Sequence, residues 1–214
     1  MKLIFLGPPG AGKGTLADLA VQERKLPHIS TGDLFRAAVK DGTELGLKVK
    51  GILASGGLVP DDLTIALVRE RLAAPDAKAG WILDGFPRTI PQAEALEAFA
   101  PADKVVNFEV DDAVVVARLS TRRVCRACGK IYNTRTMPPK KEGACDACGG
   151  EVYTRDDDKE ASIRTRLENY RKQTAPLIAW YEAKGKLLTI DGVGEPKLVL
   201  TRFDAALGSA SGRA

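Results

Sequence analysis

The sequence GPPGAGKGT, residues 7–15, decides the expected fold. It follows a short apolar run at residues 2–6, which is typical of a buried parallel strand, and it precedes a helical apolar pattern at residues 15–22. A glycine-rich loop between a strand and a helix, with the spacing G-x-x-x-x-G-K, turns backbone N–H groups toward an anion. We therefore predict a phosphate-binding loop in which Lys13 reaches the β- and γ-phosphates of a nucleotide. A glycine-rich turn with a solvated lysine is the weaker alternative.

Outside this loop, strand-like and helix-like segments alternate. Further apolar runs that are typical of buried strands lie at residues 81–83, 104–110 and 186–190. An acidic first turn and an apolar helical pattern predict a helix at residues 111–123. Strands separated by helices predict the α/β class, with a parallel sheet flanked by helices on both faces. Residues 31–59, helical but rich in glycine, and residues 125–158, rich in turns, are expected to be insertions into this core.

Composition and charge exclude several classes of protein. The chain has 214 residues, of which 44% are hydrophobic and 28% charged, so its composition is that of an ordinary globular domain and not of a disordered chain. It lacks an apolar run of the ~18 residues that a membrane span needs, and its apolar start is followed by no signal-peptide cleavage site. The net charge of +4 is too small to indicate nucleic-acid binding by itself. We expect a soluble cytoplasmic protein.

The four cysteines form two C-x2-C pairs separated by sixteen residues: Cys125, Cys128, Cys145 and Cys148. This spacing is typical of a zinc ribbon, in which two turns bring four thiolates to one tetrahedral ion. Four such ligands leave no open coordination position, so we predict a structural Zn²⁺ and not a catalytic one. Two disulfide bonds are the alternative, which a chain without a secretion signal disfavours.

Asp84 follows the apolar run at residues 81–83, so we expect it at the carboxyl edge of the sheet, where α/β proteins bind ligands. A carboxylate in this place can orient water molecules around Mg²⁺, and Thr15 offers a hydroxyl on the other side of the ion. We predict that Thr15 and Asp84 hold the Mg²⁺ of a nucleotide, partly through water. An aspartate that only caps a loop is the alternative.

One departure from the general phosphate-loop pattern indicates a family, because Gly14 stands between Lys13 and Thr15 where that pattern has Ser or Thr directly after the lysine. Together with this loop, three later segments resemble the adenylate kinases in order along nearly the whole chain: STGDLFR at residues 30–36, GLVPD at 57–61, and DGFPR at 84–88 with Gln92. The resemblance implies the fold of the P-loop nucleoside monophosphate kinases. It also implies the reaction MgATP + AMP ⇌ 2 ADP, which maintains the nucleotide pool, carried out by a monomer.

The resemblance implies three sets of site residues. Those implied to surround the transferred phosphoryl group are Lys13, Arg88, Arg122, Arg155 and Arg166. Those implied to bind ATP are Gly10, Ala11, Gly12, Lys13, Gly14, Thr15, Arg118, Arg122, Ile131, Tyr132 and Gly194. Those implied to bind AMP are Thr31, Arg36, Gly57, Leu58, Val59, Gly85, Phe86, Pro87, Arg88, Gln92, Arg155 and Arg166.

The chemistry of these residue types fits such a reaction. Phosphoryl transfer needs aligned substrates and a neutralised charge more than covalent help, and arginine binds phosphate oxygens in pairs while it stays charged. The amide of Gln92 can donate and accept at once, as an edge of adenine requires. No general base is expected, because the acceptor phosphate is already an anion.

The resemblance also implies a division of the chain. A core at residues 1–29, 60–120 and 159–214 carries an AMP-binding segment at residues 30–59 and a zinc-bearing lid at residues 121–158, and both insertions are expected to close over the substrates. His28, the single histidine, lies outside every motif and favours a structural or surface role. The three consecutive aspartates at residues 156–158 are typical of a solvated face, and pairing with the core at the hinge of an open lid is the alternative.

Two other hypotheses stay open. The first is another nucleoside monophosphate kinase, which acts on UMP or CMP or uses GTP. The second is a zinc-ribbon ATPase that binds nucleic acid, which would need basic and aromatic residues clustered around the cysteines. The ribbon offers Tyr132 and Tyr153 as its aromatic residues, so this second hypothesis is the weaker one. We expect ATP, AMP and ADP as partners, with no nucleic acid and no membrane.

Overall fold

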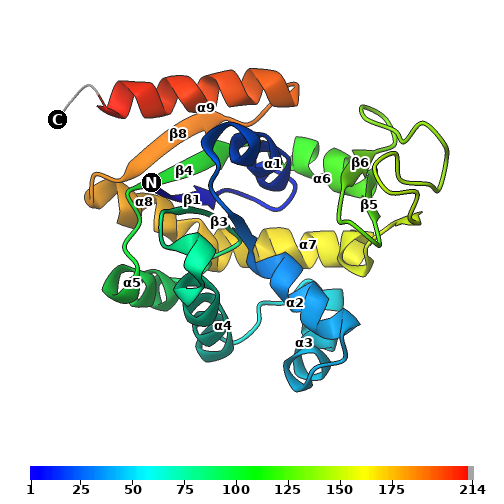
Figure 1. The fold of residues 1–214 in the computed structure, drawn as a ribbon, viewed down its shortest axis with the longest axis horizontal. Helices are drawn as coiled ribbons and strands as arrows, with labels where there is room; N and C mark the ends of the chain where they lie inside the picture. The colour runs from blue at the N-terminus through cyan, green and yellow to red at the C-terminus, as the bar shows by residue number, and fades with distance from the viewer. Residues whose placement is uncertain (212–214) are drawn as a thin grey trace.

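A parallel five-stranded sheet lies at the centre of residues 1–211, the part of the chain that the computed structural model describes (Figure 1). The strand order is β2-β3-β1-β4-β8, and all neighbours in it are parallel. The bounds are β1 Lys2–Leu6, β2 His28–Ser30, β3 Trp81–Asp84, β4 Lys104–Glu109 and β8 Leu187–Asp191. The α/β class predicted from the alternating pattern is confirmed.

Helices cover both faces of this sheet (Figure 1). Their bounds are α1 Lys13–Arg24, α2 Thr31–Lys40, α3 Glu44–Ala54, α4 Asp61–Ala73, α5 Ile90–Phe99, α6 Asp112–Ser120, α7 Glu160–Asn169, α8 Pro176–Ala183 and α9 Pro196–Ser211. A π-helical turn, Tyr170–Thr174, joins α7 to α8. No helix in the described residues is both long enough and apolar enough to cross a membrane.

Alternating strand residues build the two halves of the core. In β1, Ile4 and Leu6 face the apolar side chains of α4, α5 and α8, whereas Leu3 and Phe5 face those of α1 and α9. Successive side chains of a strand point to opposite faces, so a continuous apolar run such as β1 can be buried on both sides. The core therefore holds the carboxyl ends of β1, β3 and β4 side by side, where the loops after these strands meet.

The structure corrects the predicted helix at residues 111–123, because α6 ends at Ser120. Arg122 instead begins a small antiparallel sheet in the order β6-β5-β7, made of β5 Arg122–Cys125, β6 Ile131–Asn133 and β7 Val152–Tyr153. Asn133 donates its amide to the hydroxyl of Thr121 over 2.8 Å, and the N–H of Thr134 donates to the carbonyl of Thr121. These contacts with a strand partner replace the next turn of the helix.

Residues 31–59 form a separate helical pair. The helices α2 and α3 pack around Phe35, Val49 and Val59, a small apolar cluster outside the two halves of the core. The hydroxyl of Thr43 caps the start of α3 by accepting the N–H of Gly46 over 3.1 Å. This compact pair is attached to the sheet at the carboxyl end of β2 (Figure 1).

We predict that Gly46→Ala destabilises the protein. A Cβ at this position would lie 2.1 Å from the carbonyl oxygen of Ala38, so α2 and α3 would have to move apart. Such overpacking costs about 1–3 kcal/mol, which outweighs the roughly 1 kcal/mol that alanine gains over glycine in a helix.

Gly51→Ala is the matched control, because it lies in the same helix and a Cβ there meets no atom within 4 Å. Thermal and urea denaturation should show a loss of stability for Gly46→Ala and a small gain for Gly51→Ala. Equal stability of the two variants would contradict the close approach of α2 and α3.

Candidate nucleotide-binding site

The glycine-rich segment at residues 7–15, called the phosphate-type loop below, connects β1 to α1. It places Lys13 at the first residue of that helix. The Nζ of Lys13 donates to the carbonyl oxygens of Gly7 and Pro8, each over 2.8 Å. Gly12 adopts the left-handed conformation with φ 98°, which a residue with a Cβ rarely adopts. The loop therefore curls around the lysine, and the backbone N–H groups at the start of α1 are left without helical partners.

Burial lowers the pKa of Lys13 to about 8, and the attraction of Asp84 only partly offsets this effect. The neighbouring guanidinium groups of Arg88, Arg122 and Arg166 lower it further. A bound phosphate would act in the opposite sense, because an anion beside the ammonium favours its charged form. An anionic ligand would therefore stabilise the charged form of Lys13, and the loop favours binding of such a ligand.

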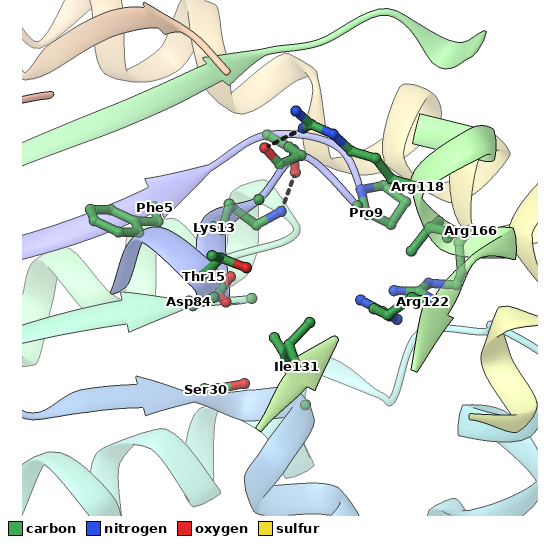
Figure 2. Close-up of a pocket in the computed structure, with 18 of the residues that line it drawn as sticks. Phe5, Pro9, Lys13, Thr15, Ser30, Asp84, Arg118, Arg122, Ile131 and Arg166 are labelled. Carbon is green, nitrogen blue, oxygen red and sulfur yellow. Dashed lines mark hydrogen bonds between the residues drawn. The ribbon is translucent and has the colours of Figure 1, made fainter. Parts of the chain in front are cut away.

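A cavity of about 310 Å³ opens from this loop and is lined by residues from the sheet, from α2, from the lid and from α7. Figure 2 shows Arg122 and Arg166 on the wall that faces Lys13, Thr15 and Asp84. Residues implied for ATP that line the cavity are Gly10, Ala11, Gly12, Lys13, Gly14, Thr15, Arg118, Arg122, Ile131, Tyr132 and Gly194. Residues implied for AMP that line it are Arg36, Gly57, Leu58, Gly85, Pro87, Arg88, Arg155 and Arg166.

Four of the residues implied for AMP are buried and do not belong to the cavity lining of the described chain: Thr31, Val59, Phe86 and Gln92. The hydroxyl of Thr31 donates to the carbonyl of Gly85 over 2.8 Å. The amide of Gln92 accepts the N–H of Arg88 over 2.8 Å and donates to Asp61 over 2.7 Å. Thr31 and Gln92 thus hold the loop after β3, whose residues Gly85 and Arg88 form the cavity wall.

Carboxylates hold the arginines of the cavity in place. Arg122 donates two hydrogen bonds to Asp158, over 2.8 and 2.5 Å, and Arg166 donates to the same carboxylate over 3.1 Å. Arg166 also lies 3.0 Å from Asp157. The side chain of Asp158 has no exposed surface, so the expected solvated face at residues 156–158 is wrong for Asp157 and Asp158. Only Asp156 of the three is largely exposed.

The segment at residues 30–59 and the lid meet through a shared carboxylate. Asp33 accepts a hydrogen bond from Arg36 over 2.7 Å and lies 3.5 Å from the Nη2 of Arg155. Burial lowers the pKa of Arg155 and of Arg166 to about 10, and nearby positive charge adds to this effect. The arginines therefore form a dense, partly desolvated cationic wall.

Asp84 ends β3 beside Lys13 and His28. The imidazole of His28 lies between two carboxylates, with Nδ1 3.6 Å from Asp18 and Nε2 3.7 Å from Asp84. Burial acts to raise the pKa of Asp84, but His28 and Lys13 outweigh burial and bring this pKa below its usual range. Asp84 is thus a carboxylate at neutral pH and suits a divalent cation bound to a nucleotide, with Thr15 beside it (Figure 2).

Arg118 joins the phosphate-type loop to the loop that contains Gly194. Its two terminal nitrogens donate to the carbonyls of Ala11, over 3.2 Å, and Gly192, over 3.0 Å. Burial lowers the pKa of Arg118. The side chain therefore fixes two backbone segments on either side of one end of the cavity.

The four cysteine sulfurs lie within 4.8 Å of one another in the lid. The Sγ atoms of Cys125 and Cys148 are 3.5 Å apart, and those of Cys128 and Cys145 are 3.6 Å apart, so all four thiols are free. A zinc ion with Zn–S bonds of ~2.3 Å in a tetrahedron places its sulfurs about 3.8 Å apart, which these distances fit. The two disulfide bonds considered as an alternative are not formed.

Tyr132 connects this cysteine cluster to the cavity. Its hydroxyl lies 3.3 Å from the Sγ of Cys145 and accepts the N–H of Asp146 over 2.8 Å. The hydrogen bond from Tyr132 lowers the pKa of Cys145 to about 6, which favours the thiolate that binds a metal. Tyr132 is also among the residues that line the cavity, so one residue takes part in both sites.

Sequence reasoning did not find Asp33, Asp61, Asp157 or Asp158 as partners of site residues. Asp33 and Asp61 lie inside the segments STGDLFR and GLVPD. Asp33 pairs with Arg36 of its own segment, but its second partner, Arg155, and the partner of Asp61, Gln92, are far away in the sequence. The acidic run that begins directly after Arg155 and includes Asp157 was a signal, because an acidic run beside candidate phosphate ligands can pair with them. His28 was assigned only a structural or surface role, and no local signal places it against Asp84.

A phosphate-type loop at the end of a central strand, facing a cavity walled by arginines, defines a nucleotide-binding phosphotransferase of the P-loop class. The sequence model of the family described as adenylate kinase matches residues 5–186. The chain is 56% identical to an adenylate kinase of Treponema denticola, over 95% of this chain and 97% of that one.

Other relatives agree with this match. The chain is 56% identical to an adenylate kinase of Fervidobacterium nodosum, over 90% of each chain. It is 49% identical to one of Lysinibacillus sphaericus, over 98% of this chain and 99% of that one. The chain belongs to the adenylate kinase family, which confirms the resemblance and the expected fold.

We predict that His28 stabilises the protein in a pH-dependent way. Burial opposes a charge on the imidazole, but Asp18 and Asp84 outweigh burial and raise the pKa of His28 to about 9. The unfolded value is about 6.5, so this contribution is fully present below pH ~6.5 and is lost as the pH rises through about 9. The difference between the folded and unfolded pKa values of His28 corresponds to about 1.36 kcal/mol per unit. The charged imidazole therefore contributes about 3 kcal/mol to the free energy of unfolding at low pH.

Urea denaturation of the wild type and of His28→Gln, without nucleotide and Mg²⁺, should show a large difference in stability at pH 6. The difference should be smaller at pH 8 and close to zero at pH 9.5. A difference that does not change with pH would contradict a charged His28 in the folded protein.

Proposed function

We propose that this protein transfers a phosphoryl group reversibly from MgATP to AMP to give two ADP, and so balances the adenine nucleotide pool. Family membership supports this activity. The observation that carries it is one cavity lined at the same time by the phosphate-type loop and by arginines from the loop after β3, from the lid and from α7. The other hypotheses, another nucleoside monophosphate kinase and a nucleic-acid-binding ATPase, lack a comparable observation.

ATP occupies the end of the cavity beside the phosphate-type loop. The N–H groups of residues 10–15 and the Nζ of Lys13 hold its β- and γ-phosphates, while Arg118 and the loop with Gly194 lie beside the base. Ile131 and Tyr132 cover this nucleotide from the lid. Asp84 and Thr15 would hold the Mg²⁺ that enters with ATP, partly through water, and the ion would neutralise charge on the phosphates.

AMP occupies the opposite end. Arg36 and Arg88 hold its phosphate, and its base lies among Thr31, residues 57–59, residues 85–87 and Gln92. Asp33 already orients Arg36, and the carbonyl of Gly85 accepts the Nε of Arg88 over 3.0 Å. Both guanidinium groups therefore keep several N–H donors free for phosphate oxygens.

The transferred group moves in the space between the two nucleotides. Three arginines face this space: Arg122, Arg155 and Arg166. Arg122 and Arg166 each use only some of their N–H donors on Asp158. The remaining N–H groups stabilise the charge that spreads over the phosphoryl oxygens during transfer. Because the positions of the arginines are set before the reaction, little reorganisation is needed at the moment of transfer.

The division of the chain into a core and two moving parts belongs to this proposal. Residues 1–29, 60–120 and 159–214 form the core, residues 30–59 bind AMP, and residues 121–158 form the lid. Closure of both segments excludes water, which would otherwise compete with AMP for the γ-phosphate. The small sheet β6-β5-β7 has little apolar core of its own, and a structural Zn²⁺ on the four cysteines holds it together.

We further propose a cytoplasmic monomer without nucleic-acid or membrane partners. The four free thiols suit a reducing compartment. The large apolar side chains with exposed surface in the described chain belong to separate segments of the sequence: Met1, Leu47, Val116, Met137, Val193 and Leu198.

The central test is a coupled assay of ADP formation with AMP, UMP, CMP and GMP as acceptors, which should show turnover with AMP. Lys13→Met should fold, because Lys13 stands at the first residue of α1, outside the two apolar halves of the core, and its charge is disfavoured by burial. Its kcat/KM should fall by about 10²–10³-fold or more, the usual effect of losing a donor to a developing charge. Lys78→Met, at an exposed lysine far from the cavity, is the control and should match the wild type. Near-normal turnover by folded Lys13→Met would contradict the assignment of the loop.

A second prediction concerns the metal. Metal analysis should find about one zinc ion per chain. The double variant Cys125→Ser/Cys128→Ser should lose the ion and melt at a lower temperature, but should keep much of its activity at low temperature, because the sulfurs do not line the cavity of the described chain. A folded, metal-free variant with no activity at low temperature would instead make the ion part of the chemistry.

A further inference from the structure

Asp61, the first residue of α4, binds the start of α5 through both carboxylate oxygens. Its Oδ1 accepts a hydrogen bond from the Nε2 of Gln92 over 2.7 Å, and its Oδ2 accepts one from the hydroxyl of Thr89 over 3.0 Å. Thr89 caps α5 and accepts the backbone N–H of Gln92 over 3.3 Å. Gln92 and Thr89 are buried and Asp61 is half-buried, so the Gln92 end of this connected group is shielded from water.

The two partners of Gln92 determine which way its amide points. At one end the backbone N–H of Arg88 can only donate, and it donates to the Oε1 of Gln92 over 2.8 Å. At the other end the carboxylate of Asp61 can only accept. If the amide were reversed, its NH2 group would face the N–H of Arg88 and its oxygen would face the carboxylate of Asp61. Neither pair could then form a hydrogen bond.

The fixed amide has limited capacity left. One hydrogen on Nε2 and one lone pair on Oε1 remain after the bonds to Asp61 and Arg88. Adenine carries an amino donor at position 6 next to a ring-nitrogen acceptor, whereas guanine and hypoxanthine carry an oxygen acceptor at position 6. The lone pair on Oε1 matches the 6-amino group, and it repels a 6-oxo group.

We propose that Asp61 is a specificity-determining residue for the monophosphate, because it holds the amide of Gln92 in the orientation that accepts 6-aminopurines and rejects 6-oxopurines. Asp61 itself lies behind Gln92 and acts as a positioning residue. This inference rests on the proposed function, in which the base of AMP lies against Gln92. Arg88, which is hydrogen-bonded to the same amide, lines the cavity, so the amide is next to the cavity wall.

The unaltered protein provides a first test with three acceptors: AMP, purine riboside 5′-monophosphate, which has only hydrogen at position 6, and IMP, which has an oxygen there. A fixed amide meets a matching donor in the first, no group in the second and a repelling acceptor in the third. We expect kcat/KM to fall in that order. An amide that can turn would pair with IMP, so IMP equal to or better than purine riboside monophosphate overturns the proposal.

Asp61→Asn provides the second test. Asparagine offers both a donor and an acceptor, so it can support either orientation of Gln92. We expect the ratio of kcat/KM for AMP to that for IMP to fall by about 10-fold or more, with the KM for ATP unchanged, since a lost repulsion between buried polar groups changes selectivity by at least this factor. Asp62→Asn, at the exposed neighbouring position, is the control and should keep the wild-type ratio.

The outcomes separate the two proposals. A wild-type protein that does not phosphorylate AMP contradicts the proposed function itself. A wild-type protein that phosphorylates AMP, together with folded Asp61→Asn whose AMP-to-IMP ratio stays within twofold of wild type, contradicts only the role of Asp61. If Asp61→Asn does not fold, the acceptor series with the wild type decides alone.

Discussion

Several positive charges gathered around one partly buried cavity are the constraint on which the rest of the structure depends. Lys13 and the arginines of the cavity repel one another and are short of water, which lowers the pKa of Lys13 to about 8 and those of Arg155 and Arg166 to about 10. Such a group of charges is stable only with counter-charges nearby. Aspartates supply them within the chain, and the phosphates of two nucleotides supply more. Ligand binding and the proposed closure of the two inserted segments are therefore expected to favour each other.

The fold brings these charges together because neighbouring parallel strands end at the same edge of the sheet. β1 leads into the phosphate-type loop, and β3, its direct neighbour, ends at Asp84. β4 leads to α6, whose last turn carries Arg118, and the chain then enters the lid at Arg122. The positions of these groups follow from the strand order and not from their separation in the sequence.

The sheet, the loop and the cysteine cluster could be predicted from sequence because each depends on local spacing. β2 could not, because its three residues contain one apolar side chain, Ile29, and its place depends on pairing with β3. The early end of α6 depends on Asn133, twelve residues beyond Thr121. The pairing of Asp158 with Arg122 and the contact of His28 with Asp84 join residues that only the folded chain brings together. For the same reason the sequence predicts Gln92 as a ligand but does not reveal Asp61 behind it.

The carboxylates around the arginines have to meet two opposite demands, since they must neutralise the cations and still leave them free for phosphate. Different carboxylates meet these two demands in different parts of the structure. Arg122 and Asp158 stand at the two ends of the lid, and their hydrogen bonds of 2.5 and 2.8 Å close its base with a short buried pair. Asp33 and Arg155 link the lid to residues 30–59 over 3.5 Å, a weaker contact between two segments that are proposed to move. Strong pairs within one part maintain geometry, whereas a weak pair between parts can open for a nucleotide and form again after it leaves. A short buried pair between the two segments would resist opening, and release of product would slow accordingly.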